Sequence, residues 1–422
     1  MSTLINAVME RQTRLPQPEP GLTPKEIIRR AAELRPLLLE EQANSEARGG
    51  CSAEMHERFR KAGFYRILQP KMYGGYEFDL TVFAQVIMEI GRGCPGTAWG
   101  LSLAAGHSLN VAAIFPEDAQ DAIFGDDGEF YAPARAVPSG TATETSDGWI
   151  IDGLWDYCSG SPHSNYALFG VRIAEGDPKG PPVFGTAIVP RADWDLLDNW
   201  RGFIGLNASG SNSIRIDKVL VPKNFVVRQN LFDLNIAGGT VGYHLHGNPM
   251  YSGRLFGFFQ TEISSILVGA GYAALDEFER IIQVKMAGPV TPIVSAGLQD
   301  LMRPYGIAQG LLEVARNSVI AGAQSYLDYC AAGVKDPSAY TALDDMRIQA
   351  GMQHSARLAG EAIDLLYTSV GTSAAAKDGT RLQRYFRDIS MARTNPGLAV
   401  ERAAVQLANR SFKERLASAA AE

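Results

Sequence analysis

The segment GLWDYCSGSPHSNYALFG, residues 153–170, places chemically active side chains in the middle of a strand-like pattern. Bulky residues at its start and an apolar run at its end are typical of a buried strand. Between them stand small and polar residues, among them Cys158, Ser159, Gly160 and His163. A thiol, a hydroxyl and an imidazole can all form hydrogen bonds, so this interruption is a candidate contact point for a ligand. A simple turn after the strand is the alternative interpretation.

Histidines offer acid–base or metal chemistry at other points of the chain. His107 lies in the otherwise apolar stretch LAAGHSLNVAAIF, where a lone histidine is either a core residue bonded to a backbone carbonyl or a functional group. His244 and His246 alternate like two metal ligands on one strand, but the sequence offers no third ligand beside them. We therefore expect these two side chains to line a pocket, and we predict no metal site.

Several common catalytic signatures do not occur in the sequence. There is no GxSxG elbow, no HExxH pair and no Walker loop. The run GAGYAA, residues 269–274, fits a GxGxxA dinucleotide fingerprint, but its flanks keep helical periodicity. Residues 288–291 also supply no acidic side chain for a ribose. The small residues are therefore predicted to let two helices pack closely, and no nicotinamide site is expected.

The composition excludes several classes of function. The 422 residues carry a net charge of −7 and no basic stripe, which argues against nucleic acid as a partner. No apolar run reaches the roughly 18 residues that span a bilayer, and the first residues lack the apolar core of a secretory signal. The four cysteines are scattered, so neither a disulfide framework nor a zinc site is expected. A cytoplasmic protein of two or three packed units is predicted.

The hydrophobic pattern predicts helices, then strands, then helices again. Thr23, Pro24 and Glu26 predict a helix start with a capping box, after which apolar residues recur at helical spacing. Short β-branched and aromatic runs between turns predict the strands, and three long apolar-periodic segments predict the later helices. The predicted domains are an N-terminal helical domain (1–128), a middle β-domain (129–228), and a substrate loop with a C-terminal four-helix bundle (229–422).

Five motifs carry a resemblance to a known family. They are, in chain order, PKMYGGYEFDL, GCPGTAW, GWIIDGLWDYCSG, GLNASGSNSIRIDKVLVP and LQRYFRD. In this order they resemble the acyl-CoA dehydrogenase superfamily, and in detail they are similar to its flavin-dependent monooxygenase branch, the oxygenase components of two-component aromatic hydroxylases. The resemblance covers nearly the whole chain. It implies the acyl-CoA dehydrogenase fold, mostly α with a central β-domain, and a homotetramer.

The resemblance also implies a role for the interrupted strand. In such proteins this strand runs beside the flavin ring, and a hydroxyl residue touches the N5/O4 edge. That position falls on Ser159, with Gly160 clearing the space that a flat ring needs. The further cofactor contacts that we expect are Trp155, Cys158, His163 and Arg387.

The reaction implied by the resemblance is oxygen insertion. A separate NAD(P)H:flavin reductase supplies reduced FMN or FAD, O2 is the co-substrate, and a C4a-hydroperoxyflavin transfers one oxygen atom to a small aromatic or heteroaromatic substrate. Such a species needs a dry pocket. An arginine that reaches FAD in the dehydrogenases would fall near Gly288 and is missing, so either FMN or FAD fits the sequence.

On the substrate side, the resemblance makes His107 the acid–base group. Relatives usually carry a second histidine eight residues after the arginine of the RD pair. Here that position is Asn395, which can form hydrogen bonds but cannot take a proton. His244 or His246 could replace it. The expected pocket residues are His244, His246, Tyr251, Phe256 and Phe259.

Other functions on the same fold stay open. A dehydrogenase needs a carboxylate base, and the YEGT-like glutamate after the RD pair is missing, since the next acidic residue is Glu401. Glu262 on an earlier helix is the nearest substitute. Oxygenation at nitrogen or sulfur is a second alternative. A flavin-storing or scaffold protein would be a non-enzymatic one, and its pocket would be plugged by side chains.

Overall fold

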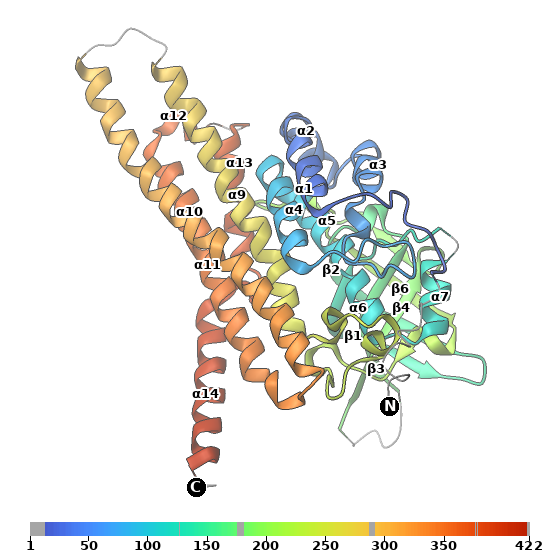
Figure 1. The fold of residues 1–422 in the computed structure, drawn as a ribbon. Coiled ribbons are helices and arrows are strands. Elements are labelled where there is room, and N and C mark those ends of the chain that lie inside the picture. The colour runs from blue at the N-terminus through green and yellow to red at the C-terminus, as the bar shows by residue number, and fades with distance from the viewer. Residues whose placement is uncertain are drawn as a thin grey trace.

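The computed structural model describes residues 13–419 except 126, 175–180, 287–291, 376 and 378. A group of short helices near the N-terminus, a twisted sheet and a set of long helices follow one another along the chain (Figure 1). The predicted fold class, mostly α with a central β-unit, is confirmed. The position near Gly288, where the dehydrogenases' arginine was expected, lies outside the described residues.

The N-terminal helices begin and end at the residues that local chemistry favours. Thr23 accepts a hydrogen bond from the backbone of Glu26, Pro24 occupies the first turn, and Gly63 ends the third helix in a left-handed conformation. The capping box is wrong in its second half, because the Glu26 carboxylate pairs with Arg29 and Arg30 instead. The helices are α1 (Pro24–Glu33), α2 (Arg35–Arg48), α3 (Ala53–Ala62), α4 (Leu80–Gly93), α5 (Pro95–Gly106), α6 (Ser108–Ile114) and α7 (Glu117–Phe124).

Within the described residues, seven strands form one sheet in the order β5-β6-β2-β1-β3-β4-β7. β1 and β3 are parallel, and the other neighbours are antiparallel. Their inward side chains form an apolar core beside the helices. The strands are β1 (Ala134–Glu144), β2 (Trp149–Cys158), β3 (Tyr166–Ile173), β4 (Val183–Pro190), β5 (Asp195–Leu197), β6 (Asn212–Val221) and β7 (Val226–Val227).

The later part of the chain forms long helices that run side by side (Figure 1). α4 and α5 lie between them and the sheet, since both contact α9, and α5 also contacts the short helical turn at residues 207–209. The later helices are α8 (Val241–His246), α9 (Leu255–Met286), α10 (Pro292–Gly333), α11 (Ala342–Ser369), α12 (Thr372–Ala375), α13 (Arg381–Ala392) and α14 (Val400–Ala419).

Two absences hold for the described residues. None of their helices is long and apolar enough to cross a membrane. They also contain no group of three histidine, cysteine, aspartate or glutamate side chains that could hold a metal ion.

The GAGYAA run lies in the middle of helix α9, as predicted. A Cβ atom at Gly269 would clash with the backbone of α4 at Met88 and Gly91, and one at Gly271 would clash with Leu312 of α10. The small residues therefore allow α9 to approach both neighbouring helices closely.

Gly269→Ala should lower the free energy of unfolding by about 1–3 kcal/mol, because the added methyl group overpacks the α4–α9 contact. Gly306→Ala is the matched control, since Gly306 is an exposed helical glycine of α10 with open space around it. That change should raise stability by roughly 0.5–1 kcal/mol. Urea unfolding measures both. Equal tolerance of the two changes would contradict close packing at Gly269.

Candidate active site

A β-bulge ends strand β2 and directs its last residues inward. Trp155 pairs with Ile214 and Cys158 pairs with Asn212, so two residues of β2 oppose one residue of β6. The extra residue is Tyr157, which has a left-handed φ of 63° and a side chain that is 53% exposed. Because the bulge absorbs this residue, the side chains of Cys158 and the following residue both turn into the protein.

Ser159 lies in a cluster of hydroxyl groups at the end of β2. Its Oγ accepts a hydrogen bond from Trp99 Nε1 (3.1 Å) and lies 2.7 Å from Ser211 Oγ, which in turn lies 2.7 Å from Ser209 Oγ. If the protons run from Ser209 to Ser211 to Ser159, both lone pairs of Ser159 Oγ are occupied. Its own proton is then the donor that the cluster can offer to a ligand.

Gly160 brings the end of β2 against helix α5. It has a left-handed φ of 82°, and its N–H donates to the carbonyl of Ser209 over 3.0 Å. A Cβ atom there would clash with the carbonyl of Gly100 and would crowd Ala104. The glycine is therefore required by a close approach of two backbones.

Two of the expected cofactor contacts lie in the core of the sheet. Trp155 is buried, donates its indole N–H to the carbonyl of Gly170 (3.1 Å) and stacks on Phe169. Cys158 is buried and its Sγ lies 3.2 Å from the carbonyl of Trp155. Burial raises the pKa of the Cys158 thiol to about 12, so it stays a neutral thiol. Both side chains are thus satisfied within the core, and a flavin contact for them stays a prediction.

His163 lies beside a narrow cavity. Its Nε2 is 3.0 Å from the carbonyl of Cys51, and its ring stacks on His56 at 4.8 Å. Burial, with His163 as a smaller cause, lowers the pKa of His56 to about 4. The adjoining cavity, lined in part by Gly160 and Tyr65, has a volume of about 20 Å³, which suits one water molecule and not a flavin ring.

His107 occupies the junction between α5 and α6 and is only 5% exposed. Its Nδ1 donates to the carbonyl of Ala132 over 2.8 Å, which fixes the tautomer and leaves a lone pair on Nε2. Burial lowers the pKa of His107 to about 4, although the hydrogen bond to Ala132 opposes the shift. The ring is therefore neutral at pH 7.

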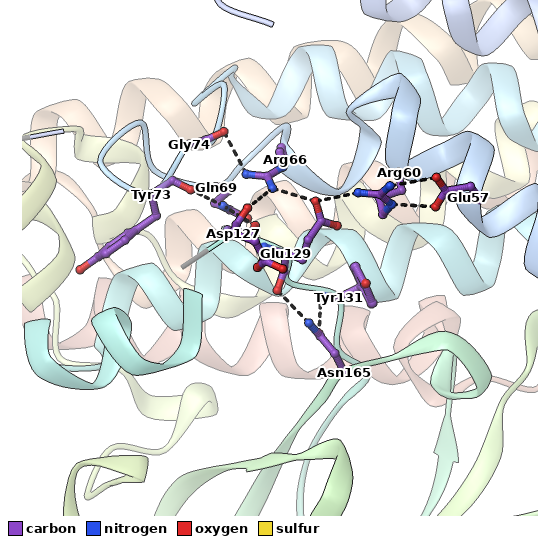
Figure 2. Close-up of polar contacts among 11 residues, drawn as sticks. Glu57, Arg60, Arg66, Gln69, Tyr73, Gly74, Asp127, Glu129, Tyr131 and Asn165 are labelled. Atoms are coloured by element: carbon purple, nitrogen blue, oxygen red, sulfur yellow. Dashed lines mark hydrogen bonds and ion pairs between the residues drawn. The ribbon is translucent and has the colours of Figure 1, made fainter. Parts of the chain in front are cut away.

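A buried polar network holds the backbone that positions His107 (Figure 2). Gln69 donates to the carbonyl of Gly128 (2.9 Å), and Arg66 pairs with Glu129 (2.8 Å). On the other side, Asn165 donates to the carbonyl of Glu129 and accepts from the N–H of Tyr131. Residues 128–131 are thus held from two sides. The next residue is Ala132, whose carbonyl accepts the hydrogen bond from His107.

Glu262 faces His107 from helix α9. Its side chain is completely buried, and within the described part of the chain neither carboxyl oxygen has a hydrogen-bond partner. Its Oε1 lies 3.8 Å from Nε2 of His107. Burial raises the pKa of this carboxyl well above its usual value, so the pair is a neutral acid beside a neutral imidazole and not an ion pair.

The two alternating histidines lie on the short helix α8, within the segment that the sequence predicted as a substrate loop. His246 is buried, with Nε2 2.8 Å from Gln120 Oε1 and its ring edge-on to Tyr251. Tyr251 donates to the carbonyl of Leu68. His244 is exposed. Residues two positions apart in an α-helix point to different sides, so these two histidines do not share a face.

Asn395 caps its own turn. Its side-chain oxygen accepts from the N–H of Gly397 (2.8 Å), and Phe259 packs against the same glycine. Phe256 lies near Phe232, with ring centroids 6.3 Å apart. The amide oxygen is therefore already occupied, which weakens the expectation that Asn395 acts on substrate.

Arg387 ties helix α13 to two other segments. It pairs with Glu46 of α2 (2.6 Å) and donates to the carbonyl of Ile204. Its neighbour Asp388 is buried and accepts from the N–H of Leu206, while burial raises the pKa of Asp388 to about 7. Arg387 is thus half-buried in a structural network, and a flavin contact for it stays a prediction.

The structure therefore brings together two groups along helix α5. Ser159 and Gly160 meet α5 at Trp99 and Gly100, and His107 lies at its end beside Glu262. Sequence reasoning assigned no role to Trp99, Ser209 or Ser211, although all three stand in motifs that carry the family resemblance. The hydroxyl-rich run GLNASGSNS could have indicated the cluster around Ser159, but it served only as a motif of the family resemblance.

Two family models match this chain. Residues 24–122 match the N-terminal domain of acyl-CoA dehydrogenase and residues 262–395 match its C-terminal domain, which together cover more than half of the chain.

Three relatives match most of their own length. A pigment production hydroxylase from Rhodococcus sp. is 29% identical over 90% of this chain and 95% of its own. The oxygenase subunit HsaA of a flavin-dependent monooxygenase from Rhodococcus jostii is 27% identical over 91% and 98%. The oxygenase component of p-hydroxyphenylacetate 3-hydroxylase from Acinetobacter baumannii is 25% identical over 88% and 85%.

Solved structures show the same fold. The 3-HSA hydroxylase from Rhodococcus sp. RHA1 superposes with a TM-score of 0.83 at 24% identity, over 92% of this chain and 97% of that one. XiaF from Streptomyces sp., in complex with FADH2 and glycerol, gives 0.76 at 22% over 93% and 96%. FMN-bound TdsC from Paenibacillus sp. A11-2 gives 0.71 at 19% over 92% and 97%.

Glu129→Gln should lower the free energy of unfolding by about 3 kcal/mol, because it leaves the buried Arg66 guanidinium without its counter-ion. Glu57→Gln is the control, since the Glu57 side chain is 40% exposed at the outer end of the same network and its loss should change stability little. Urea unfolding followed by tryptophan fluorescence compares them. Equal small effects would mean that the network does not hold this segment.

Proposed function

We propose that this chain, which belongs to the acyl-CoA dehydrogenase superfamily and whose homologues are oxygenase components of two-component flavin-dependent monooxygenases, inserts one oxygen atom of O2 into a small aromatic or heteroaromatic substrate. As an oxygenase component it takes reduced flavin from a separate reductase. FMN and FAD both stay open, since each is bound in a protein of the same fold. A homotetramer is part of the proposal.

The observation that carries the proposal is the hydroxyl cluster at the end of β2. Reduced flavin, when bound, supplies the electrons that activate O2 and delivers one oxygen atom. Ser159 fits the N5/O4 edge of such a ring, because its Oγ accepts from Trp99 and, when Ser211 also donates to it, its own proton is left for a ligand. Gly160 lets the end of β2 pack against α5, which keeps Ser159 beside Trp99, and the exposed Tyr157 offers an aromatic surface two residues away.

The other half of the proposed site is the neutral, buried His107. A base within a dry site must have an unprotonated nitrogen, and the bond from Nδ1 to Ala132 leaves that nitrogen at Nε2. Its burial excludes bulk water from the ring. Exclusion of water favours oxygen transfer over loss of H2O2.

The state of Glu262 argues against the acyl-CoA dehydrogenase alternative. A dehydrogenase needs an ionised carboxylate to remove a substrate proton. Burial raises the pKa of the Glu262 carboxyl well above its usual value, and no lysine or arginine among the described residues forms an ion pair that would favour the ionised form. These surroundings favour the neutral acid, which is not the form that such a base needs. Oxygenation at a substrate nitrogen or sulfur is the alternative reaction on the same fold.

Ser159→Ala tests the proposed function. Wild-type protein loaded anaerobically with FMNH2 or FADH2 and mixed with O2 should release H2O2 more slowly than the free flavin does. The variant should release it about 5 to 150 times faster than wild type, because a lost hydrogen bond in a dry site is worth roughly 1–3 kcal/mol. Ser139→Ala, an exposed serine of β1, is the control. If wild type does not slow H2O2 release, the proposed function fails.

His107→Asn should preserve the fold and the affinity for reduced flavin but reduce product formation from an aromatic acceptor by about 10²-fold, the range of a positioned acid–base group. O2 consumption should continue, with the oxygen recovered as H2O2. The exposed His354→Asn serves as the control. An unstable variant that still converts O2 fully into product would make His107 a structural residue.

A further inference from the structure

The Glu262 carboxyl is a buried polar group that the packing of the described part of the chain leaves without partners. It lies on α9 with both oxygens buried and without hydrogen-bond partners among the described residues. A buried polar group left unpaired costs about 1–3 kcal/mol, and such groups are rare in folded proteins. A leucine of similar volume would avoid this cost. The group therefore requires an explanation outside the packing of the core.

The surroundings of the carboxyl are shaped to leave room for it. A Cβ atom at Gly106 would clash with Glu262 Oε1, and the ring of Phe258 lies against the same glycine. Ser102, which lies one turn before Gly106 in α5, donates to the backbone carbonyl of Glu262 over 3.1 Å. This hydrogen bond fixes α9 against α5. The carboxyl is thus held at one place, opposite the end of α5.

The only nearby polar group that the structure gives for the carboxyl among the described residues is Nε2 of His107. The distance of 3.8 Å is too long for a direct hydrogen bond. It suits a single polar atom that lies within hydrogen-bond distance of both groups. Because Nδ1 already donates to Ala132, Nε2 can only accept. Because the carboxyl is held protonated by burial, it can donate.

We propose that Glu262 and His107 together bind one hydroxyl group of the aromatic substrate, and that Glu262 stabilises the oxyanion formed when this hydroxyl gives its proton to His107. The proposal rests on the proposed oxygenase function. The hydroxyl donates to Nε2 of His107 and its oxygen accepts from the carboxyl of Glu262. Few substrate groups do both. An ammonium or an indole N–H only donates, and a thioether sulfur only accepts, so the geometry selects a hydroxylated ring.

The pair also assists the loss of the hydroxyl proton. The O–H bond breaks, its proton forms an N–H bond at Nε2 of His107, and the electron pair stays on the substrate oxygen. The Glu262 carboxyl keeps its own proton and stabilises the resulting oxyanion by a charge-assisted hydrogen bond. No other reactant is needed. Asn395 caps its own turn through its amide oxygen, and an amide cannot take a proton.

Ligand pairs that differ in one methyl group test the proposal. One-, two- and three-ring hydroxyaromatics, each with its O-methyl ether, are titrated into wild-type protein loaded anaerobically with FMNH2 or FADH2. In wild type at least one hydroxyl compound should bind about tenfold or more tightly than its ether. Glu262→Leu should bring that ratio close to one, and Glu262→Gln should restore part of it, because an amide also donates. Glu279→Gln, an exposed acid on the same helix, should leave the ratio unchanged.

The outcomes separate this proposal from the proposed function. If no hydroxyl compound is preferred by wild type, or if Glu262→Leu keeps the preference, the Glu262 proposal is overturned. Equal binding of each pair would mean that the gap serves an internal water only. Slow release of H2O2 by the same preparations shows in parallel whether the oxygenase function holds. If Glu262→Leu binds the ethers as wild type does but loses the hydroxyl preference, the fold is intact and the proposal stands.

Discussion

The contact between helix α5 and the end of strand β2 is the constraint on which the rest of the site depends. Gly100 and Gly160 let the two backbones meet without intervening side chains. That approach allows Trp99 to hold Ser159, and it carries the end of α5 to Ala132 and Glu262. Trp99 and His107 are about 12 Å apart along a helix that rises 1.5 Å per residue. One rigid helix therefore sets the distance between the proposed flavin contact and the proposed substrate contact.

Burial determines the charge state of the groups at the far end of this helix. Desolvation favours neutral forms, so it lowers the pKa of His107 and raises that of Glu262. The result is an acceptor and a donor with no net charge, which an apolar ring can approach without a large desolvation penalty. The Ser159 cluster differs, because its oxygens are already bonded to one another and to Trp99. The His107–Glu262 pair is therefore free to bind a ligand, whereas the Ser159 cluster is held in place by its own hydrogen bonds.

The sequence predicted the features that arise from local chemistry. The N-cap at Thr23 and the helical nature of the GAGYAA run follow from spacing along the chain, and the structure confirms both. The inward turn of Ser159 depends on a bulge at Tyr157, which shifts register against a distant strand and leaves no period-2 signal. The family resemblance directed attention to Asn395 as a substrate contact and not to the cap that it forms. The alternating spacing of His244 and His246 gave no sign of the short helix α8. The meeting of His107 with Glu262 is a tertiary contact, which no local pattern can reveal.

The central claim is that this site is built for reduced flavin and O2. An anaerobic titration of the purified protein with FMNH2, FADH2, FMN and FAD tests it most directly. We expect the protein to carry little flavin when purified and to bind one of the reduced flavins with a lower Kd than its oxidised form. Tight co-purification of oxidised FAD, together with bleaching of that FAD by an acyl-CoA, would contradict the account and restore the dehydrogenase.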